Sequence, residues 1–382
     1  YQSGISVIIE GSQTRKSVIF IWLLSGKSVI LWRNQIEKSV MLKRKIQKVL
    51  HDYFCSESSK VLLLDGARQI GKSFIIRHEA KKFFKNYIEI NFLEDKNGEK
   101  LFAGISTVKD FYLKLSVFAG GKMGDKKNTI VFLDEIQAYP ELLTLLKFLK
   151  DDARFTYIAS GPWLGVTLNK TLSKPGGRIQ KVKMHPLDFE EFLWANGVSE
   201  KVVDTVKSCF EQEFVVPEGI HKVMMELLYR YVIVGGLPAV VNTFLQTKNI
   251  EQTYHVQRNL ITEYEDDMVK YAADADKPRI RECFESIPKQ LAKENKKFQY
   301  SVVRKGCRSS QYIGSIQWLE DAGIAKRCYN TQITELPLEG NAIPDCFKLY
   351  TTDIGILVSM LDYGTQADIL KGNLLAYKGA IF

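Results

Sequence analysis

Residues 60–73 read Lys60-Val-Leu-Leu-Leu-Asp-Gly-Ala-Arg-Gln-Ile-Gly-Lys-Ser73. This stretch joins an apolar run, typical of a buried strand, to the pattern Gly-x-x-x-x-Gly-Lys-Ser and then to a helical pattern over 73–84. Glycines let backbone N–H groups approach phosphate oxygens, and a helix N-terminus favours negative charge. The stretch therefore predicts a phosphate-binding loop (P-loop, Walker A motif). The alternative is a glycine-containing surface turn.

The residues of this loop are the expected nucleotide ligands. We expect the phosphates to be cradled by Gly66, Ala67, Arg68, Gln69, Ile70 and Gly71. Lys72 is expected to be an exposed loop lysine that reaches the β- and γ-phosphates, and Ser73 to offer its hydroxyl to Mg²⁺. The expected cofactors are ATP and Mg²⁺.

A second apolar strand, 129–133, ends in two adjacent carboxylates, Asp134 and Glu135. Ligands of parallel sheets bind at the carboxyl ends of strands, where the P-loop also emerges. We expect Asp134 to hold the metal and Glu135 to activate the attacking water, as in a Walker B motif. The alternative is that the pair only caps the helical segment that starts near Pro140.

Two further residues are weaker candidates. Ser160 follows the strand 155–159 and is either a sensor of the γ-phosphate or a turn residue. Arg178 follows the turn Pro175-Gly-Gly177. It is either an arginine that acts on a nucleotide, in the same chain or in a neighbouring one, or a surface arginine at the start of a strand.

Strand and helix patterns alternate over residues 60–195, which predicts an α/β P-loop NTPase fold with a parallel sheet covered by helices. From about Leu187 to Ala273 the pattern is helical. Two helices (280–294 and 309–322) and two strands (324–329 and 346–350) follow, an order that suggests a winged-helix-like module. The sequence thus predicts an extension over 1–40, a P-loop domain over 41–198, a helical region over 199–275, a winged-helix-like module over 276–352 and the start of a further domain over 353–382.

Charge is concentrated at the N-terminus. The 382 residues carry a net charge of +9, and residues 1–50 hold nine Lys/Arg against two Glu, which is +7 of that total. We interpret residues 1–40 as a poorly specified extension before Met41, where an amphipathic helix over 42–50 is expected. Six scattered cysteines without a Cys-x-x-Cys pair exclude a zinc ribbon and favour a cytoplasmic location. No apolar run is long enough to predict a membrane span.

Six motifs, in order, resemble the predicted prokaryotic AAA+ superfamily ATPases that carry an uncharacterised, nuclease-like C-terminal domain. They are Leu63–Ser73, Phe132–Gln137, Pro186–Trp194, Tyr231–Pro238, Asp267–Ala272 and Ser315–Gly323. The resemblance implies ATP binding by the P-loop, metal and water handling by Asp134 and Glu135, and a basic residue at the place of Arg178. It also implies a winged-helix-like middle region.

The chain departs from this family at two places. Pro162-Trp163 stands where the family has a serine, and proline removes an N–H donor close to the sensor position. The sequence also stops at Phe382, where family members continue with an acidic helical segment and a β-rich region. We therefore expect most of the C-terminal domain, and any nuclease chemistry, to be absent.

Two functions fit these features. The first is an ATPase that acts as a switch or motor, for which Glu135 is the deciding residue. The second is a nucleotide-gated DNA-binding module with little turnover, based on the basic segment 293–308 and on Ser310, Gln311, Ser315 and Gln317 of the following helix. A solvated charged loop is the alternative for that segment. A small-molecule kinase is a third, distant possibility, and the oligomeric state cannot be predicted.

Overall fold

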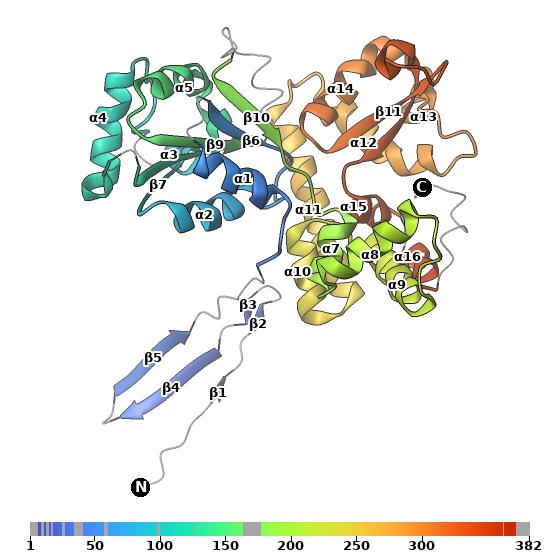
Figure 1. Ribbon diagram of the computed structural model, residues 1–382, viewed down its shortest axis with the longest axis horizontal. Coiled ribbons are helices and arrows are strands. Elements are labelled where there is room, and N and C mark those ends of the chain that lie inside the picture. Colours follow the sequence, from blue (N-terminus) through green and yellow to red (C-terminus); the bar gives the residue numbers. More distant parts are fainter. Residues whose placement is uncertain are drawn as a thin grey trace. The chain divides into compact units, whose positions relative to one another are not determined.

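The computed structural model describes residues 41–56, 60–97, 100–125, 127–162, 177–361 and 363–371, together with five strands within residues 7–33. The chain divides into two compact units, Tyr1–Met41 and Leu42–Phe382 (Figure 1). The predictions for Trp163, for the turn residues Pro175 and Gly176, and for the chain end at 378–382 concern residues outside the described part.

The first unit consists of short antiparallel strands. One sheet has the order β1-β4-β5, and β2 pairs with β3. The strands are β1 (Val7–Ile8), β2 (Gly11–Ser12), β3 (Arg15–Lys16), β4 (Val18–Leu24) and β5 (Lys27–Arg33). The sequence interpretation of a poorly specified extension assigned no strands to this segment.

The second unit is built around a five-stranded parallel sheet with the order β10-β6-β9-β8-β7. Its strands are β6 (Val61–Asp65), β7 (Asn86–Asn91), β8 (Thr129–Asp134), β9 (Thr156–Gly161) and β10 (Ile179–Lys183). Every residue of β6 and β8 is buried, as expected for strands covered on both faces. The predicted α/β P-loop NTPase fold is confirmed.

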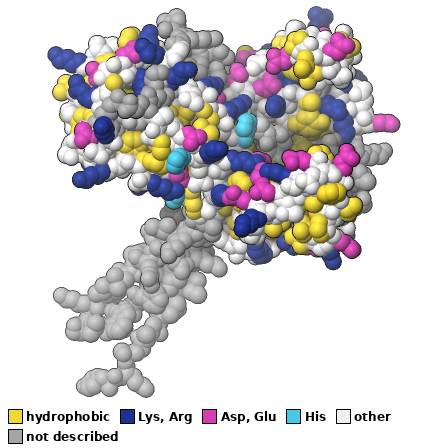
Figure 2. Space-filling model, in the orientation of Figure 1, with side chains coloured by type: hydrophobic (Ala, Val, Ile, Leu, Met, Phe, Trp, Pro, Cys, Tyr) yellow, Lys and Arg dark blue, Asp and Glu magenta, His cyan; other side chains and the backbone are white. Residues whose placement is uncertain are grey.

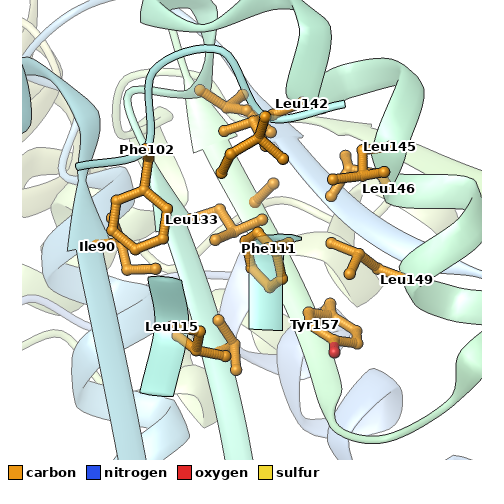
Figure 3. Close-up of a cluster of buried hydrophobic side chains, with 14 of the residues drawn as sticks. Ile90, Phe102, Phe111, Leu115, Leu133, Leu142, Leu145, Leu146, Leu149 and Tyr157 are labelled. Carbon is orange, nitrogen blue, oxygen red and sulfur yellow. The ribbon is translucent and has the colours of Figure 1, made fainter. Parts of the chain in front are cut away.

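Helices cover both faces of this sheet (Figure 1). They are α1 (Ile46–Cys55), α2 (Lys72–Phe83), α3 (Phe92–Asn97), α4 (Val108–Ala119) and α5 (Pro140–Asp152), with single 3₁₀ turns at Gly120–Lys122 and Ile136–Ala138. Figure 3 shows the core on one face, where Leu133 of β8 and Tyr157 of β9 pack against Phe111 of α4 and Leu149 of α5. Burial of these large side chains fixes the strands whose carboxyl ends carry the site.

A helical region follows β10, as the sequence predicts. It contains α7 (Phe189–Ala195), α8 (Glu200–Glu211), α9 (Glu218–Val234), α10 (Pro238–Thr247) and α11 (Ile250–Tyr271). A capping box of Asp188 and Glu191 starts α7, and Asn249 caps α11 by accepting a hydrogen bond from the Gln252 N–H at 3.1 Å. This region supplies several contacts to the P-loop that are described below.

The last part of the described chain starts with three helices, α12 (Lys277–Leu291), α13 (Tyr300–Val303) and α14 (Ser309–Asp321). An antiparallel pair, β11 (Ala325–Thr331) and β12 (Ala342–Thr351), follows, with a 3₁₀ turn at Leu338–Asn341 between its strands. Helices α15 (Ile354–Ser359) and α16 (Tyr363–Leu370) come after it. Helices α12 and α14 and strands β11 and β12 follow the predicted order, whereas the short helix α13 was not predicted. The winged-helix interpretation stays a prediction.

The predicted helix over 42–50 is wrong at its start. Residues 41–44 are not helical, and α1 begins at Ile46 and runs to Cys55. The cause is Arg44, whose side chain is buried and paired with Glu191 of α7, so that the chain enters the helix only after this contact is made.

Among the described helices, none has the length and apolar character needed to cross a membrane. Each of the six cysteines, all of which lie in the described part, is free.

Candidate functional site

The P-loop connects the end of β6 to the start of α2, where the sequence predicts it. Gly71 adopts φ +89° directly before the first turn of α2, a left-handed conformation that favours glycine. A Cβ atom on Gly66 would lie 2.4 Å from the carbonyl oxygen of Met184, which follows β10. Both glycines of the motif are therefore required by the backbone path itself.

Lys72 is not the exposed loop lysine that the sequence analysis expected. Its side chain is buried, and its ammonium donates hydrogen bonds to the carbonyl oxygens of Gly66 at 3.0 Å and Ala67 at 2.7 Å. These bonds hold Lys72 against the loop, because a buried ammonium must find acceptors. Ser73 follows it in the first turn of α2, half-buried.

The carboxylates and Ser160 meet at the carboxyl ends of two neighbouring strands. Leu133 of β8 pairs with Ala159 of β9, which places Asp134 beside Ser160. The Ser160 hydroxyl donates to Asp134 Oδ1, and the Glu135 N–H donates to the same oxygen at 3.0 Å. Ser160 is fully buried, so it positions Asp134 rather than forming an exposed turn.

Glu135 leaves the strand in a left-handed conformation, with φ +55°, and its Oε2 accepts a hydrogen bond from the Gln137 amide at 2.5 Å. Burial raises the pKa of Glu135, and the charge of Asp134 raises it further against the opposing effects of Gln137, Lys72 and Arg68. Burial lowers the pKa of Lys72 to about 8, while Glu135 and Asp134 oppose that shift. A raised carboxyl pKa and a lowered lysine pKa together are typical of functional sites.

The polar groups at this site fit a nucleoside triphosphate with its metal ion. The Ser73 hydroxyl and the Asp134 carboxylate are oxygen ligands of the kind that Mg²⁺ prefers. The loop leads into the N-terminus of α2, which favours negative charge, and Lys72 supplies a cation next to the loop. The residues present could therefore hold ATP and Mg²⁺.

Arg44 is a contact of the P-loop that the sequence analysis missed. The Arg44 guanidinium donates to the carbonyl oxygen of Ile70 at 3.2 Å, to that of His185 at 2.6 Å and to Glu191 at 3.1 Å. Its place in a predicted amphipathic helix gave no sign of burial. The one sequence feature that could have pointed to this contact is the Pro186–Trp194 motif. It contains Glu191, the partner of Arg44, but the sequence analysis assigned no function to it.

Helix α11 makes further contacts that the sequence analysis missed. Arg68 is paired with Asp267 at 2.5 Å, and the Gln69 amide donates to Glu263. Asp267 is the first residue of the Asp267–Ala272 motif, but nothing in the local sequence distinguishes it from its acidic neighbours.

Two other segments approach the same loop. A Cβ atom on Gly323, between α14 and β11, would lie 3.2 Å from the backbone nitrogen of Ala67. A Cβ atom on Gly71 would lie 3.6 Å from Pro238, the first residue of α10. The loop is thus in contact with parts of the chain that follow the sheet by many residues.

The structure does not bring Arg178 to this site. The Val61 N–H donates to the Arg178 carbonyl at 2.9 Å, so Arg178 lies level with the start of β6, whereas the P-loop follows its end. Five strand residues separate these ends by about 16 Å. Arg178 is half exposed and paired with Asp151 at 3.0 Å. The backbone of Arg178 therefore lies at the opposite edge of the sheet from the P-loop, and its action on a nucleotide, in its own chain or in a second copy, stays a prediction.

One of the four residues proposed to read DNA, Ser315, is buried on α14. Ser310, Gln311 and Gln317 are exposed. The Gln317 amide donates to Asp321 at 3.0 Å, its carbonyl oxygen accepts from Arg327, and Gln311 accepts from the Arg308 N–H at 3.1 Å.

Comparisons with known families match two parts of the chain. Residues 58–193 match the family described as AAA domain, and residues 225–367 match a domain of unknown function, DUF8612. No curated protein matches the chain. The sheet and its P-loop are thus an AAA-type P-loop domain, and the second match covers most of the helical region and the α12–β12 segment.

Among solved structures that are similar to this chain, one has a TM-score above 0.5 and supports the same fold. A Walker-type ATPase of Pyrococcus abyssi is 16% identical with a TM-score of 0.52, over 86% of this chain and 98% of that one. The Hsp104–ADP complex of S. cerevisiae is 14% identical with a TM-score of 0.34, over 73% and 39% of the two chains. Drosophila ORC bound to DNA is 13% identical with a TM-score of 0.30, over 88% and 95%. The first of these supports the fold, and the AAA domain match supports a nucleotide-binding ATPase.

Proposed function

We propose that this protein binds ATP with Mg²⁺ and hydrolyses it, and that it acts as a nucleotide-driven switch or motor. The observation that carries the proposal is the convergence of Lys72, Asp134 and Glu135 at one edge of the sheet, with Ser160 holding Asp134. A protein that only binds nucleotide has no need for a second carboxylate beside the first. The AAA domain match over the same residues supports the proposal.

Each residue has a role that follows from its environment. The loop backbone and Lys72 bind the β- and γ-phosphates, and Lys72 exchanges the carbonyls of Gly66 and Ala67 for phosphate oxygens. Ser73 and Asp134 hold Mg²⁺, which when bound neutralises charge on the phosphates. Glu135 orients the attacking water and accepts its proton, a task that its raised pKa favours.

The binding part is tested with Lys72→Ala. We expect ATP affinity to fall at least tenfold, because the variant removes the cation that faces the phosphates. Lys85→Ala, which changes an exposed lysine after α2, is the matched control and should bind like the parent. Since Lys72 also bonds the loop carbonyls, the melting temperature of both variants should be measured. Equal ATP affinity of a folded Lys72→Ala variant and the parent would refute the assignment.

The catalytic part is tested with Glu135→Gln, which keeps the side-chain shape and removes the base. We expect ATP·Mg²⁺ binding close to that of the parent and turnover reduced by about 10²-fold or more. Phosphate release measures turnover, and a nucleotide titration measures binding. Turnover at the parental rate would remove Glu135 as the base. A parent without turnover would instead favour a binding-only protein, with the buried Pro162 after β9 as the first residue to change.

A second candidate function is nucleotide-gated DNA binding by the α12–β12 segment as a winged-helix-like module. The observation in its favour is that Arg304, Lys305 and Arg308, directly before α14, are all exposed. Against it, Figure 2 shows acidic and basic side chains interspersed over the visible face rather than a single basic stripe.

The test of DNA binding is a titration with duplex DNA at several salt concentrations, with and without ATP. A Lys305→Ala/Arg308→Ala variant should weaken binding and reduce its salt dependence. Lys201→Ala/Lys222→Ala, at two exposed lysines of α8 and α9, is the control. Binding that does not depend on Lys305 and Arg308 would refute this module as the DNA site.

A further inference from the structure

Helix α11 contacts two polar side chains of the P-loop, Arg68 and Gln69. Arg68 Nη1 donates to Asp267 Oδ1 at 2.5 Å, across 199 positions of sequence. One turn earlier on the same helix, Glu263 accepts a hydrogen bond from the Gln69 amide. The hydroxyl of Tyr264, between them, donates to the Arg68 carbonyl at 3.4 Å. The loop is therefore attached to α11 through both side chains and backbone.

The pair between Arg68 and Asp267 is incomplete. Asp267 is 2% exposed, yet its Oδ2 has no hydrogen-bond partner among the described residues. A guanidinium that binds a carboxylate with two parallel bonds would use both oxygens, whereas here a single one is engaged. A buried carboxylate with only one such bond is poorly compensated. In agreement, burial raises the pKa of Asp267 to about 6 although Arg68 and Lys270 oppose that shift.

Arg68 also lies within electrostatic reach of the proposed ATP site. Burial is the main cause of the lowered pKa of Lys72, and the positive charge of Arg68 lowers that pKa further. The same charge lowers the pKa of Glu135 against the effect of burial. The Arg68 side chain is 28% exposed, so it is accessible from the loop side. A guanidinium binds phosphate oxygens as readily as it binds a carboxylate.

We infer that phosphate binding transfers the Arg68 guanidinium from Asp267 to the nucleotide, so that Asp267 is a positioning residue and α11 reports occupancy of the P-loop. This inference rests on the proposed ATP binding. In the nucleotide-free protein, Asp267 keeps Arg68 away from the phosphate position. When nucleotide binds, Arg68 changes partner and α11 loses its ion pair with the loop.

The other half of α11 connects this contact to distant parts of the chain. The Gln257 amide donates to the carbonyl oxygens of Ile233 at 2.7 Å and Val234 at 3.1 Å, at the end of α9. Arg258 donates to the carbonyl of Ser359, at the end of α15, at 3.4 Å. A change at the Arg68 end of this continuous helix therefore reaches both α9 and α15.

The inference is tested by titrating ATP into the parent, Asp267→Asn and Asp266→Asn. Asp267→Asn keeps the shape and removes the charge that competes for Arg68, so ATP should bind about tenfold tighter. Asp266→Asn makes the same charge change at the exposed neighbour and should bind ATP like the parent. Arg68→Ala should weaken ATP binding, and adding Asp267→Asn to it should then have no effect. A merely structural Asp267 would give weaker binding, and that result, or unchanged affinity, would overturn the inference.

A second measurement uses the unmodified protein, so the inference stays testable even if Asp267→Asn fails to fold. We expect saturating ATP to speed hydrogen exchange of the amides of residues 263–268. Unchanged or slower exchange there would overturn the inference. If ATP binds in a Lys72-dependent way while these effects are absent, only the inference fails. If ATP does not bind at all, the proposed function fails and the inference with it.

Discussion

Arg44→Met is expected to destabilise the second unit strongly. The Arg44 side chain is 6% exposed, and its guanidinium serves the Glu191 carboxylate and two backbone carbonyls. Removing one member of a buried ion pair costs about 3–5 kcal/mol, because the other charge stays buried without its partner. Glu191 keeps two backbone donors, the N–H groups of Lys45 at 2.6 Å and Asp188 at 3.2 Å. We therefore expect a loss near the lower end of this range, about 3 kcal/mol.

The assay is urea unfolding of the parent and the variant, followed by circular dichroism. Lys48→Met, which changes an exposed cation on α1, is the control and should alter the free energy of unfolding by less than about 0.5 kcal/mol. Arg44→Met/Glu191→Leu should regain part of the loss, since it leaves no unpaired buried charge. A loss below about 1 kcal/mol for Arg44→Met would refute the reasoning that this pair joins the P-loop to α7.

Three shorter predictions follow from other contacts. Ser160→Ala should lower turnover about tenfold with ATP affinity near that of the parent, because Asp134 loses its side-chain donor; parental phosphate release would contradict this. Gly323→Val should lower stability by about 1–3 kcal/mol and weaken ATP binding, because φ is +73° and the new side chain meets Ala67; unchanged melting and affinity would contradict it. A chain without residues 1–40 should melt within a few degrees of the full chain, keep nucleotide binding and show weaker, less salt-dependent DNA binding; a large drop in melting temperature or loss of nucleotide binding would show that this segment belongs to the ATPase core.

The central strands of the sheet were predictable because β6 and β8 are buried on both faces. Continuous apolar runs such as 61–64 and 130–133 have no polar residue to place in solvent, so they indicate central parallel strands without further context. Helix boundaries depend on single contacts and are predicted less well. The helix that was expected from Leu42 begins at Ile46 because Arg44 is paired with Glu191, 147 positions away.

Some residues of the candidate site are likewise predictable from local sequence, and others only from the fold. Gly66–Ser73 and Asp134 carry signals within a few residues, since each follows a buried strand directly. Ser160 could be placed beside Asp134 only once β9 was known to lie next to β8, which is a property of strand order and not of local sequence. Strand order also places Arg178, because a residue before a parallel strand lies at the opposite edge of the sheet from one after it.

The α11 contacts are the part that local sequence reasoning cannot supply. Residues 263–267 contain four acids, and only the fold shows that Asp267 is buried against Arg68 while Asp266 faces solvent. A residue that couples a P-loop to a distant helix needs a charge opposite to that of its partner. It must also lie on the helix face that points to the loop. Neither property can be recognised from the few residues around it. The incomplete bond at Asp267 Oδ2 is the kind of defect that a purely structural ion pair would lack, since a stable buried pair satisfies both oxygens. An exchange of partners explains why the defect is kept: a fully bonded Arg68 would be too costly to release to a phosphate.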